Sequence, residues 1–201
     1  TDHWATLSLT GSSARTILES LKPGFDVSNS AFPHLAMREA RLLGYPARIY
    51  RVSFSGELTY EINVPAGSAP VLWDAILQHG ASSGIVPYGV EALLLLRLEK
   101  GFPHLGSDTD GTTLPDDVGW GKVAANKQSH YIGKRSLSLA ANVRPDRLQL
   151  VGLAGVSKDA IPVGSHLLLP ESKQVTDGWV TSAGRAVLDG RPIALALLRG
   201  G

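Results

Sequence analysis

Residues 58–64 alternate between apolar and polar side chains, which is the period of a β-strand. The apolar residues occupy the even positions, while Thr59, Glu61 and Asn63 occupy the odd ones and point to the opposite face. Such a strand fits a sheet that packs one face against a core and keeps the other face polar. That polar face is either solvated or lines a pocket in which Glu61 meets a ligand.

The first part of the chain predicts one sheet with several helices. Apolar spacing and turn residues indicate a strand in 3–11, a helix in 12–21 and three strands within 36–64. The stretch "RVSFSGELTYEINVP" reads as two short strands around a tight turn. Two further helices are predicted in 68–84 and 87–101.

The chain changes character after this point. Residues 101–120 are rich in Asp, Gly and Pro and predict a long loop, and a short helix is expected in 133–143. Short strands cut by Gly and Pro follow, with no helix between them, which is typical of a small barrel. We therefore predict an α+β protein with an α/β domain over residues 1–145 and a small C-terminal β-barrel domain over 146–201.

Composition limits the classes of partner. The 201 residues hold 19 Lys and Arg against 18 Asp and Glu, so the net charge of +1 favours neither nucleic acid nor a membrane surface. No apolar run reaches the roughly 20 residues of a membrane helix. The absence of cysteine is compatible with the cytoplasm, which is the location we predict. The start at Thr1 without Met suggests a piece of a longer protein.

Metal and dinucleotide sites are not expected. Asp108, Asp110, Asp116 and Asp117 lack the spacing and the closing Glu of a calcium loop, and the six His form no zinc-binding pair on a helix. No G-x-G-x-x-G opens a helix, so no flavin or nicotinamide site is predicted in this chain. Arg97 and Glu99 are predicted to form an ion pair or cap at the end of their helix. The alternative is that Glu99 supports a pocket indirectly, by holding a residue that contacts the ligand.

Five stretches carry a family resemblance when they are taken together and in order. They are "RVSFSGELTYEINVP", "PYGVEALLLLRLEKGFPHLGSDTDGTTLPDDVGWG", "YIGKRSL", "LVGL" and "VTSAG…PIALALLRGG". The chain resembles the folate-binding aminomethyltransferase family, the T-protein of glycine cleavage and its relatives. A narrower resemblance, carried by "SFSGELTYEINVP", "PYGVEALLLLRLEKG" and "SDTDGT", is to the C-terminal region of heterotetrameric sarcosine oxidase alpha subunits.

The resemblance implies a tetrahydrofolate site. Its pteridine-holding Glu corresponds to Glu61, and its aromatic wall corresponds to Phe54, where the family has Tyr. Glu57 and Tyr88 complete the expected cofactor-binding set, although Glu57 also suits a turn residue and Tyr88 a packed turn. An Arg of the glycine-cleavage proteins falls on Leu93, which disfavours that branch.

The resemblance also implies that the catalytic residue and the other cofactor sites lie outside this chain. The family's catalytic Asp lies upstream of Thr1, so no catalytic residue is assigned to this chain, and the isolated fragment is expected to be inactive. In the full complex, FAD or FMN and NAD sites would lie elsewhere, and the other sarcosine oxidase subunits would be partners. The expected reaction converts sarcosine to glycine and passes the one-carbon unit to tetrahydrofolate, giving 5,10-methylenetetrahydrofolate.

Two alternatives stay open. The first is the folate module of a dimethylglycine dehydrogenase or oxidase, or of an aminomethyltransferase. The second is a non-catalytic scaffold or a folate-dependent RNA-modification protein, which predicts either no folate binding or no amine oxidation.

Overall fold

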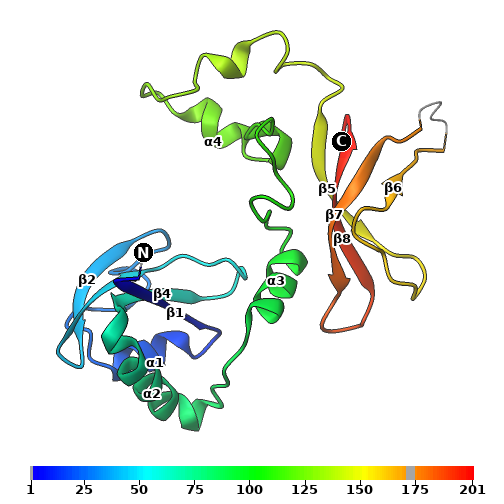
Figure 1. Ribbon diagram of the computed structural model, residues 1–201. Coiled ribbons are helices and arrows are strands. Elements are labelled where there is room, and N and C mark those ends of the chain that lie inside the picture. Colours follow the sequence, from blue (N-terminus) through cyan, green and yellow to red (C-terminus); the bar gives the residue numbers. More distant parts are fainter. Residues whose placement is uncertain (1, 171–174) are drawn as a thin grey trace. The chain divides into compact units, whose positions relative to one another are not determined.

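The computed structural model describes residues 2–170 and 175–201, and the chain divides into two compact units (Figure 1). The first unit is Thr1–Leu93 and the second is Leu94–Gly201. The chain mixes helices and sheets, which confirms the α+β class. The domain boundary predicted near residue 145 stays a prediction.

The first unit is an antiparallel sheet with helices on one side (Figure 1). Its strand order is β1-β4-β3-β2, so β4 lies between β1 and β3. The elements are β1 (Trp4–Thr10), α1 (Ala14–Ser20), β2 (Met37–Leu42), β3 (Tyr45–Tyr50), β4 (Thr59–Pro65), the 3₁₀ helices η1 (Ala66–Ser68) and η2 (Ala81–Ser83), and α2 (Ala69–Gly80).

From Tyr60 onward the alternation of β4 is borne out by its burial, whereas Thr59 at its start is buried although it belongs to the polar face. Tyr60, Ile62 and Val64 are fully buried, whereas Glu61 and Asn63 on the other face are half-buried. The buried side chains form one core with apolar residues of both helices, among them Ile17, Leu18, Leu72 and Ile76. Packing against α1 and α2 therefore selects which face of β4 is apolar.

The tight turn predicted within residues 51–65 is wrong. Strand β3 ends at Tyr50 and β4 begins at Thr59, so an irregular loop over 51–58 replaces the expected first strand of the hairpin. Ser53 Oγ lies 3.4 Å from Ser55 Oγ and 3.2 Å from Thr59 Oγ1, and Gly56 has a positive φ of 77°. These local contacts compete with strand pairing and widen the turn.

The second unit holds a separate antiparallel sheet of order β5-β8-β7-β6. The helix α3 crosses the division between the units. The elements are α3 (Val90–Glu99), the 3₁₀ helices η3 (Asp116–Val118) and η4 (Ser136–Ser138), α4 (Gly121–Asn126), β5 (Leu148–Ala154), β6 (His166–Leu167), β7 (Gly178–Arg185) and β8 (Pro192–Arg199).

The predicted barrel is not seen in the described part of the chain. Strand β5 pairs only with β8 there, and β6 pairs only with β7, so these two strands are edges of an open sheet. Strand β6 is two residues long, which is too short to close a sheet on itself. The strands of this region were predicted, but the prediction that they close into a barrel was wrong.

One helix was placed wrongly by the sequence pattern. Residues 133–143 contain only the 3₁₀ turn η4, and the α-helix lies earlier, at α4. Side chains hold the later segment in an irregular path, because Asn142 Nδ2 donates to the Ser136 carbonyl at 2.7 Å. The helix predicted in 87–101 is confirmed as α3. Within the described ranges, no helix has the length and apolarity needed to cross a membrane.

A close backbone approach shapes the second sheet at Gly178, the first residue of β7. A Cβ atom there would lie 1.9 Å from the Leu197 carbonyl oxygen and 2.9 Å from Leu198 Cα on β8. Backbone atoms cannot move aside as a flexible side chain can, so this position accepts only glycine without a shift of the strand pair.

We therefore expect Gly178→Ala to lower the free energy of unfolding by about 3 kcal/mol, the upper range for overpacking. Urea denaturation followed by circular dichroism measures this change. Gly152→Ala on β5 is the control, because no atom lies within 4 Å of the added methyl group. Equal midpoints for the two variants would contradict the assigned approach of β7 and β8.

Candidate functional site

The polar face of the first sheet has Glu61 at its centre. Glu61 on β4 is the register partner of Ser8 on β1 and of Tyr50 on β3. Register partners on antiparallel strands point to the same face, so the three side chains form one row across the sheet. Glu61 is half-buried in this row.

Glu61 differs from its polar neighbours because it has no partner. Asn63 accepts a hydrogen bond from Thr6 at 2.7 Å, and Arg48 pairs with Glu39 at 3.5 Å. Among the residues that the structure describes, none forms a hydrogen bond or ion pair with the carboxylate of Glu61. A half-buried carboxylate loses hydration and gains no protein donor here, so it is available to a ligand with N–H groups.

A chain of hydroxyl groups runs along the same face toward Glu61. Thr59 Oγ1 lies 3.2 Å from Ser53 Oγ and 3.1 Å from Thr10 Oγ1. Tyr88 Oη lies 3.1 Å from Thr10 Oγ1 and 3.4 Å from Ser8 Oγ. The chain fixes the 51–58 loop and Tyr88 relative to β1, the strand beside Glu61.

The structure brings some of the predicted site residues together. Glu61 and Tyr88 meet on one face, because Tyr88 contacts Ser8, the register partner of Glu61. Phe54 is half-buried and Glu57 is exposed, and both lie in the 51–58 loop. The Glu57 carbonyl accepts from Thr59 Oγ1 at 3.2 Å, which fits its alternative interpretation as a turn residue.

Sequence reasoning missed Ser8, Thr10 and Tyr50 as members of this face. The alternation of "WATLSLT" carried a usable signal, since Thr6, Ser8 and Thr10 share one face of β1. Tyr50 was hidden because the expected hairpin began one residue after it.

The loop over residues 101–120, called the acidic loop below, uses its aspartate carboxylates for structural hydrogen bonds and ion pairs. Asp108 is fully buried and accepts from Arg97 Nη1 at 2.6 Å and from the His104 N–H at 2.8 Å. The hydroxyls of Thr181 and Ser182 donate to its other oxygen. Arg97 also donates to Ser182 Oγ at 2.7 Å, which ties α3 and the loop to β7.

The predicted pairing of Arg97 with Glu99 is wrong. Arg97 pairs with Asp108, and Glu99 Oε1 instead accepts the Val187 N–H at 2.5 Å. Glu99 therefore bonds the backbone just after β7 and stands apart from the charge of Arg97.

Burial and hydrogen bonding oppose one another at Asp108. Burial by itself would raise the pKa of this carboxyl, but the donors from His104, Ser182 and Thr181 and the charge of Arg97 hold the pKa below its usual value. A depressed pKa in the folded state stabilises the fold above the unfolded pKa. This contribution is lost as pH falls through the lower, folded pKa.

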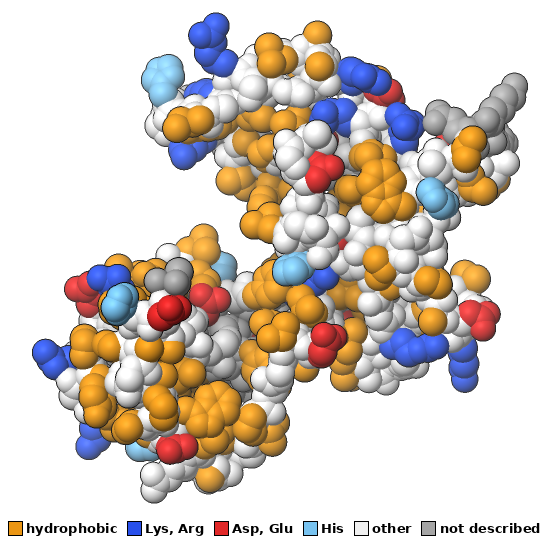
Figure 2. All heavy atoms as spheres, viewed as in Figure 1, with side chains coloured by type: hydrophobic (Ala, Val, Ile, Leu, Met, Phe, Trp, Pro, Cys, Tyr) orange, Lys and Arg blue, Asp and Glu red, His pale blue; other side chains and the backbone are white. Residues whose placement is uncertain are grey.

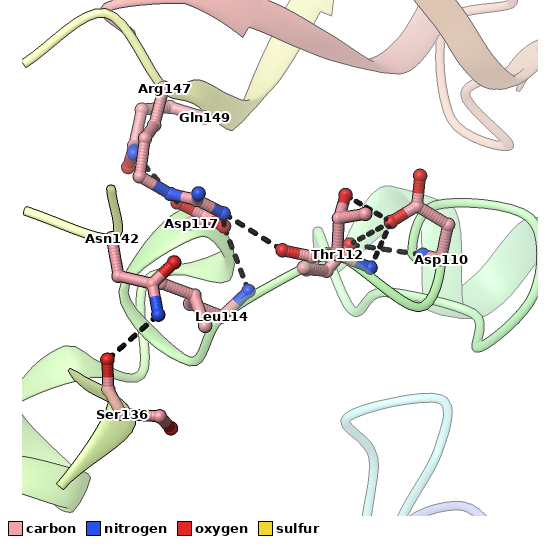
Figure 3. A network of polar contacts seen from close by, with 9 residues as sticks. Asp110, Thr112, Leu114, Asp117, Ser136, Asn142, Arg147 and Gln149 are labelled. Carbon is pink, nitrogen blue, oxygen red and sulfur yellow. Dashed lines mark hydrogen bonds and ion pairs between the residues drawn. The ribbon is translucent and has the colours of Figure 1, made fainter. Parts of the chain in front are cut away.

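A second carboxylate, that of Asp117, pairs with Arg147, the residue just before β5 (Figure 3). Arg147 Nε donates to Asp117 Oδ1 at 2.9 Å, and Arg147 Nη2 bonds both Asp117 Oδ2 and the Thr112 carbonyl. The Leu114 N–H and Gln149 Nε2 also donate to Asp117. Although burial raises the pKa of Asp117, the Arg147 and Leu114 contacts lower it overall.

These contacts bear on the metal hypothesis for the acidic loop. Asp108 and Asp117 each accept from an arginine and from further donors, and Asp110 accepts from the Thr112 N–H at 2.7 Å. In the part of the chain that the structure describes, no three His, Asp or Glu residues cluster as a metal site would require. The loop therefore uses these carboxylates to hold its own backbone.

A cavity of about 530 Å³ lies beside Asp117 in the second unit. It contains none of the predicted folate-binding residues. Polar groups that line it bond to the protein itself. Lys134 Nζ, for example, donates to the carbonyls of residues 127–129. Figure 2 shows basic and apolar side chains mixed on the surface of the α4 segment, where Val123 and Ile132 are exposed. This surface has no single charge pattern that specifies a ligand.

Comparison with known proteins gives a family match over most of the chain. The model of the GCVT N-terminal domain matches residues 1–128. The chain is 40% identical to the sarcosine oxidase subunit alpha of Rhizobium meliloti (strain 1021), over 100% of this chain and 21% of that protein. It is 31% identical to the aminomethyltransferase of Streptomyces avermitilis, over 97% of this chain and 52% of that protein.

A solved structure agrees with these sequence matches. The glycine cleavage system aminomethyltransferase T from Bartonella henselae superposes with a TM-score of 0.76 at 26% identity, covering 98% of this chain and 52% of that one. The chain therefore spans about a fifth of the sarcosine oxidase subunits and about half of the aminomethyltransferases that it matches.

The buried pair in the second unit gives a test of its own. We expect Asp108→Asn to cost about 3 kcal/mol of unfolding free energy at neutral pH, because it leaves the Arg97 charge buried without a counter-charge. Urea denaturation from pH 7 to pH 3 measures the loss, which should begin to shrink below about pH 4, where Asp108 of the unfolded chain protonates, and shrink further as pH falls toward the lower pKa of folded Asp108.

Asp159→Asn serves as the control, since Asp159 is exposed and, among the described residues, bonds within its own turn to Ser157. A loss at Asp108 that stays constant over this pH range would show that its charge contributes nothing to stability.

Proposed function

Because the chain belongs to the GCVT N-terminal domain family, we propose that it binds a reduced folate on the polar face of its first sheet. The observation that carries the proposal is the half-buried, unpartnered carboxylate of Glu61. Glu61 accepts two parallel hydrogen bonds from the ring N–H and adjacent amino group of the pterin. Such a pair of bonds fixes the position and the orientation of the ring.

The other predicted residues have supporting roles in this proposal. Phe54 supplies a flat apolar wall. Tyr88, bound to Thr10 and Ser8, limits the site on the β1 side. Glu57 contacts the ligand only if the 51–58 loop folds over it, and otherwise serves the turn.

The reaction proposed for the whole protein uses chemistry from outside these residues. Tetrahydrofolate captures the formaldehyde-level carbon of an oxidised N-methyl amine at N5, so that sarcosine yields glycine and 5,10-methylenetetrahydrofolate forms. This chain's share is to hold and orient the pterin, and no catalytic residue is assigned to it. FAD or FMN and NAD are proposed to bind elsewhere in a hetero-oligomer of sarcosine oxidase subunits.

Family similarity supports this assignment over its rivals. The matches to sarcosine oxidase subunit alpha cover the whole chain at 38–40% identity, whereas Leu93 departs from the glycine-cleavage pattern. A dimethylglycine dehydrogenase or oxidase module would use Glu61 in the same way. Its amine substrate would distinguish it from a sarcosine oxidase. A scaffold or RNA-modification role predicts that folate binding or amine oxidation is lacking. A cytoplasmic location stays a prediction.

Calorimetric titration with 5-formyltetrahydrofolate tests the role of Glu61. We expect Glu61→Gln to weaken binding by about 2 kcal/mol, or roughly 30-fold, because an amide replaces one charged acceptor by a donor. The titration is run on this chain and, where a longer protein contains it, on that longer protein as well.

Glu39→Gln is the matched control, because Glu39 is an exposed carboxylate on the same sheet that already pairs with Arg48. Equal affinities of wild type and Glu61→Gln would overturn the proposal, as would a failure of the longer protein to bind.

A further inference from the structure

Tyr50 occupies a position that neither the family resemblance nor the sequence pattern assigns. It ends β3 and is the register partner of Glu61 on β4, so both side chains stand on the polar face. Met37 on β2 is the register partner of Tyr50 on its other side. The tyrosine ring thus stands between a thioether and the unpaired carboxylate.

Among the described residues, no aromatic or cationic side chain contacts the ring of Tyr50. Phe32 stacks on Tyr60 with ring centroids 5.8 Å apart, and Tyr131 is approached by two lysines. Tyr50 has no ring contact, cation–π contact or side-chain hydrogen bond with any described residue, although it is half-buried. An aromatic ring without such a partner keeps its capacity to stack on a flat ligand.

The spacing of the strands suits a ring that stands on its edge above Glu61. Strands β3 and β1 flank β4, and two strand spacings place them about 10 Å apart. Tyr50 stands on one side, and Tyr88, bound to Ser8 and Thr10, stands on the other. A planar ring needs roughly 3.5 Å of separation from each neighbour, and the spacing of the two flanking strands is compatible with this requirement.

Resting on the proposed folate function, we infer that Tyr50 is a specificity-determining residue that stacks on the pterin ring held by Glu61. Glu61 accepts hydrogen bonds from the donor edge of the pterin ring, and Tyr50 stacks on its flat face. The aminobenzoyl-glutamate part of the ligand then points away from the sheet and makes no contact with Tyr50.

Two ligands titrated against the same variants test this assignment. The ligands are 5-formyltetrahydrofolate and a tetrahydropterin without the aminobenzoyl-glutamate tail, and the protein is the longest form that binds folate. We expect Tyr50→Leu to weaken both ligands by the same factor, about tenfold, as for loss of one aromatic stacking contact. Tyr50→Phe keeps the ring and should stay within about twofold of wild type.

Tyr45→Leu is the matched control, because Tyr45 lies on the same strand with 40% exposure and stands on the face opposite to Tyr50. Circular dichroism confirms that each variant is folded. An unchanged affinity of Tyr50→Leu, with Glu61→Gln still weakened, overturns this inference alone. Loss of affinity for the folate but not for the pterin also overturns it. Folate binding that is insensitive to Glu61→Gln overturns the proposed function and this inference with it.

Discussion

Strand β4 is the constraint on which the first unit depends, because it is paired on both edges and packed on one face. A slip of one residue in its register would move Glu61 into the core and Ile62 to the polar face. Burying a carboxylate among α1 and α2 would cost far more than any local contact returns. The hydrophobic core therefore sets the position of the carboxylate, although the core residues of β4 point to the opposite face.

The features of the fold that could be predicted from the sequence are those set by the spacing of apolar residues over a few positions. Alternation predicted the two faces of β4, and helical spacing with Pro87 and Gly101 predicted α3. The pairing of Arg97 was not predictable in this way. Residues two apart on a helix do not face each other, so Glu99 was a poor partner, whereas Asp108 becomes a neighbour only in the folded loop.

The site was predicted in part for the same reason. Glu61 stood out as a carboxylate in an alternating strand, but Ser8 and Tyr50 join it through strand pairing over separations that no local pattern records. The 51–58 loop shows the opposite case. Its serine hydroxyls form local bonds that outweigh the strand preference of Val52 and Phe54, so period alone placed the boundary wrongly.

The network around Asp108 has a consequence for the order of folding. Its arginine lies 11 residues earlier in the chain, but its two hydroxyl donors, Thr181 and Ser182, lie 73 and 74 residues later. Closing so long a loop costs entropy before the contacts form. The acidic loop can thus reach its final conformation only after β7 has joined the sheet, and cleavage of that loop by a protease during refolding would report when β7 arrives.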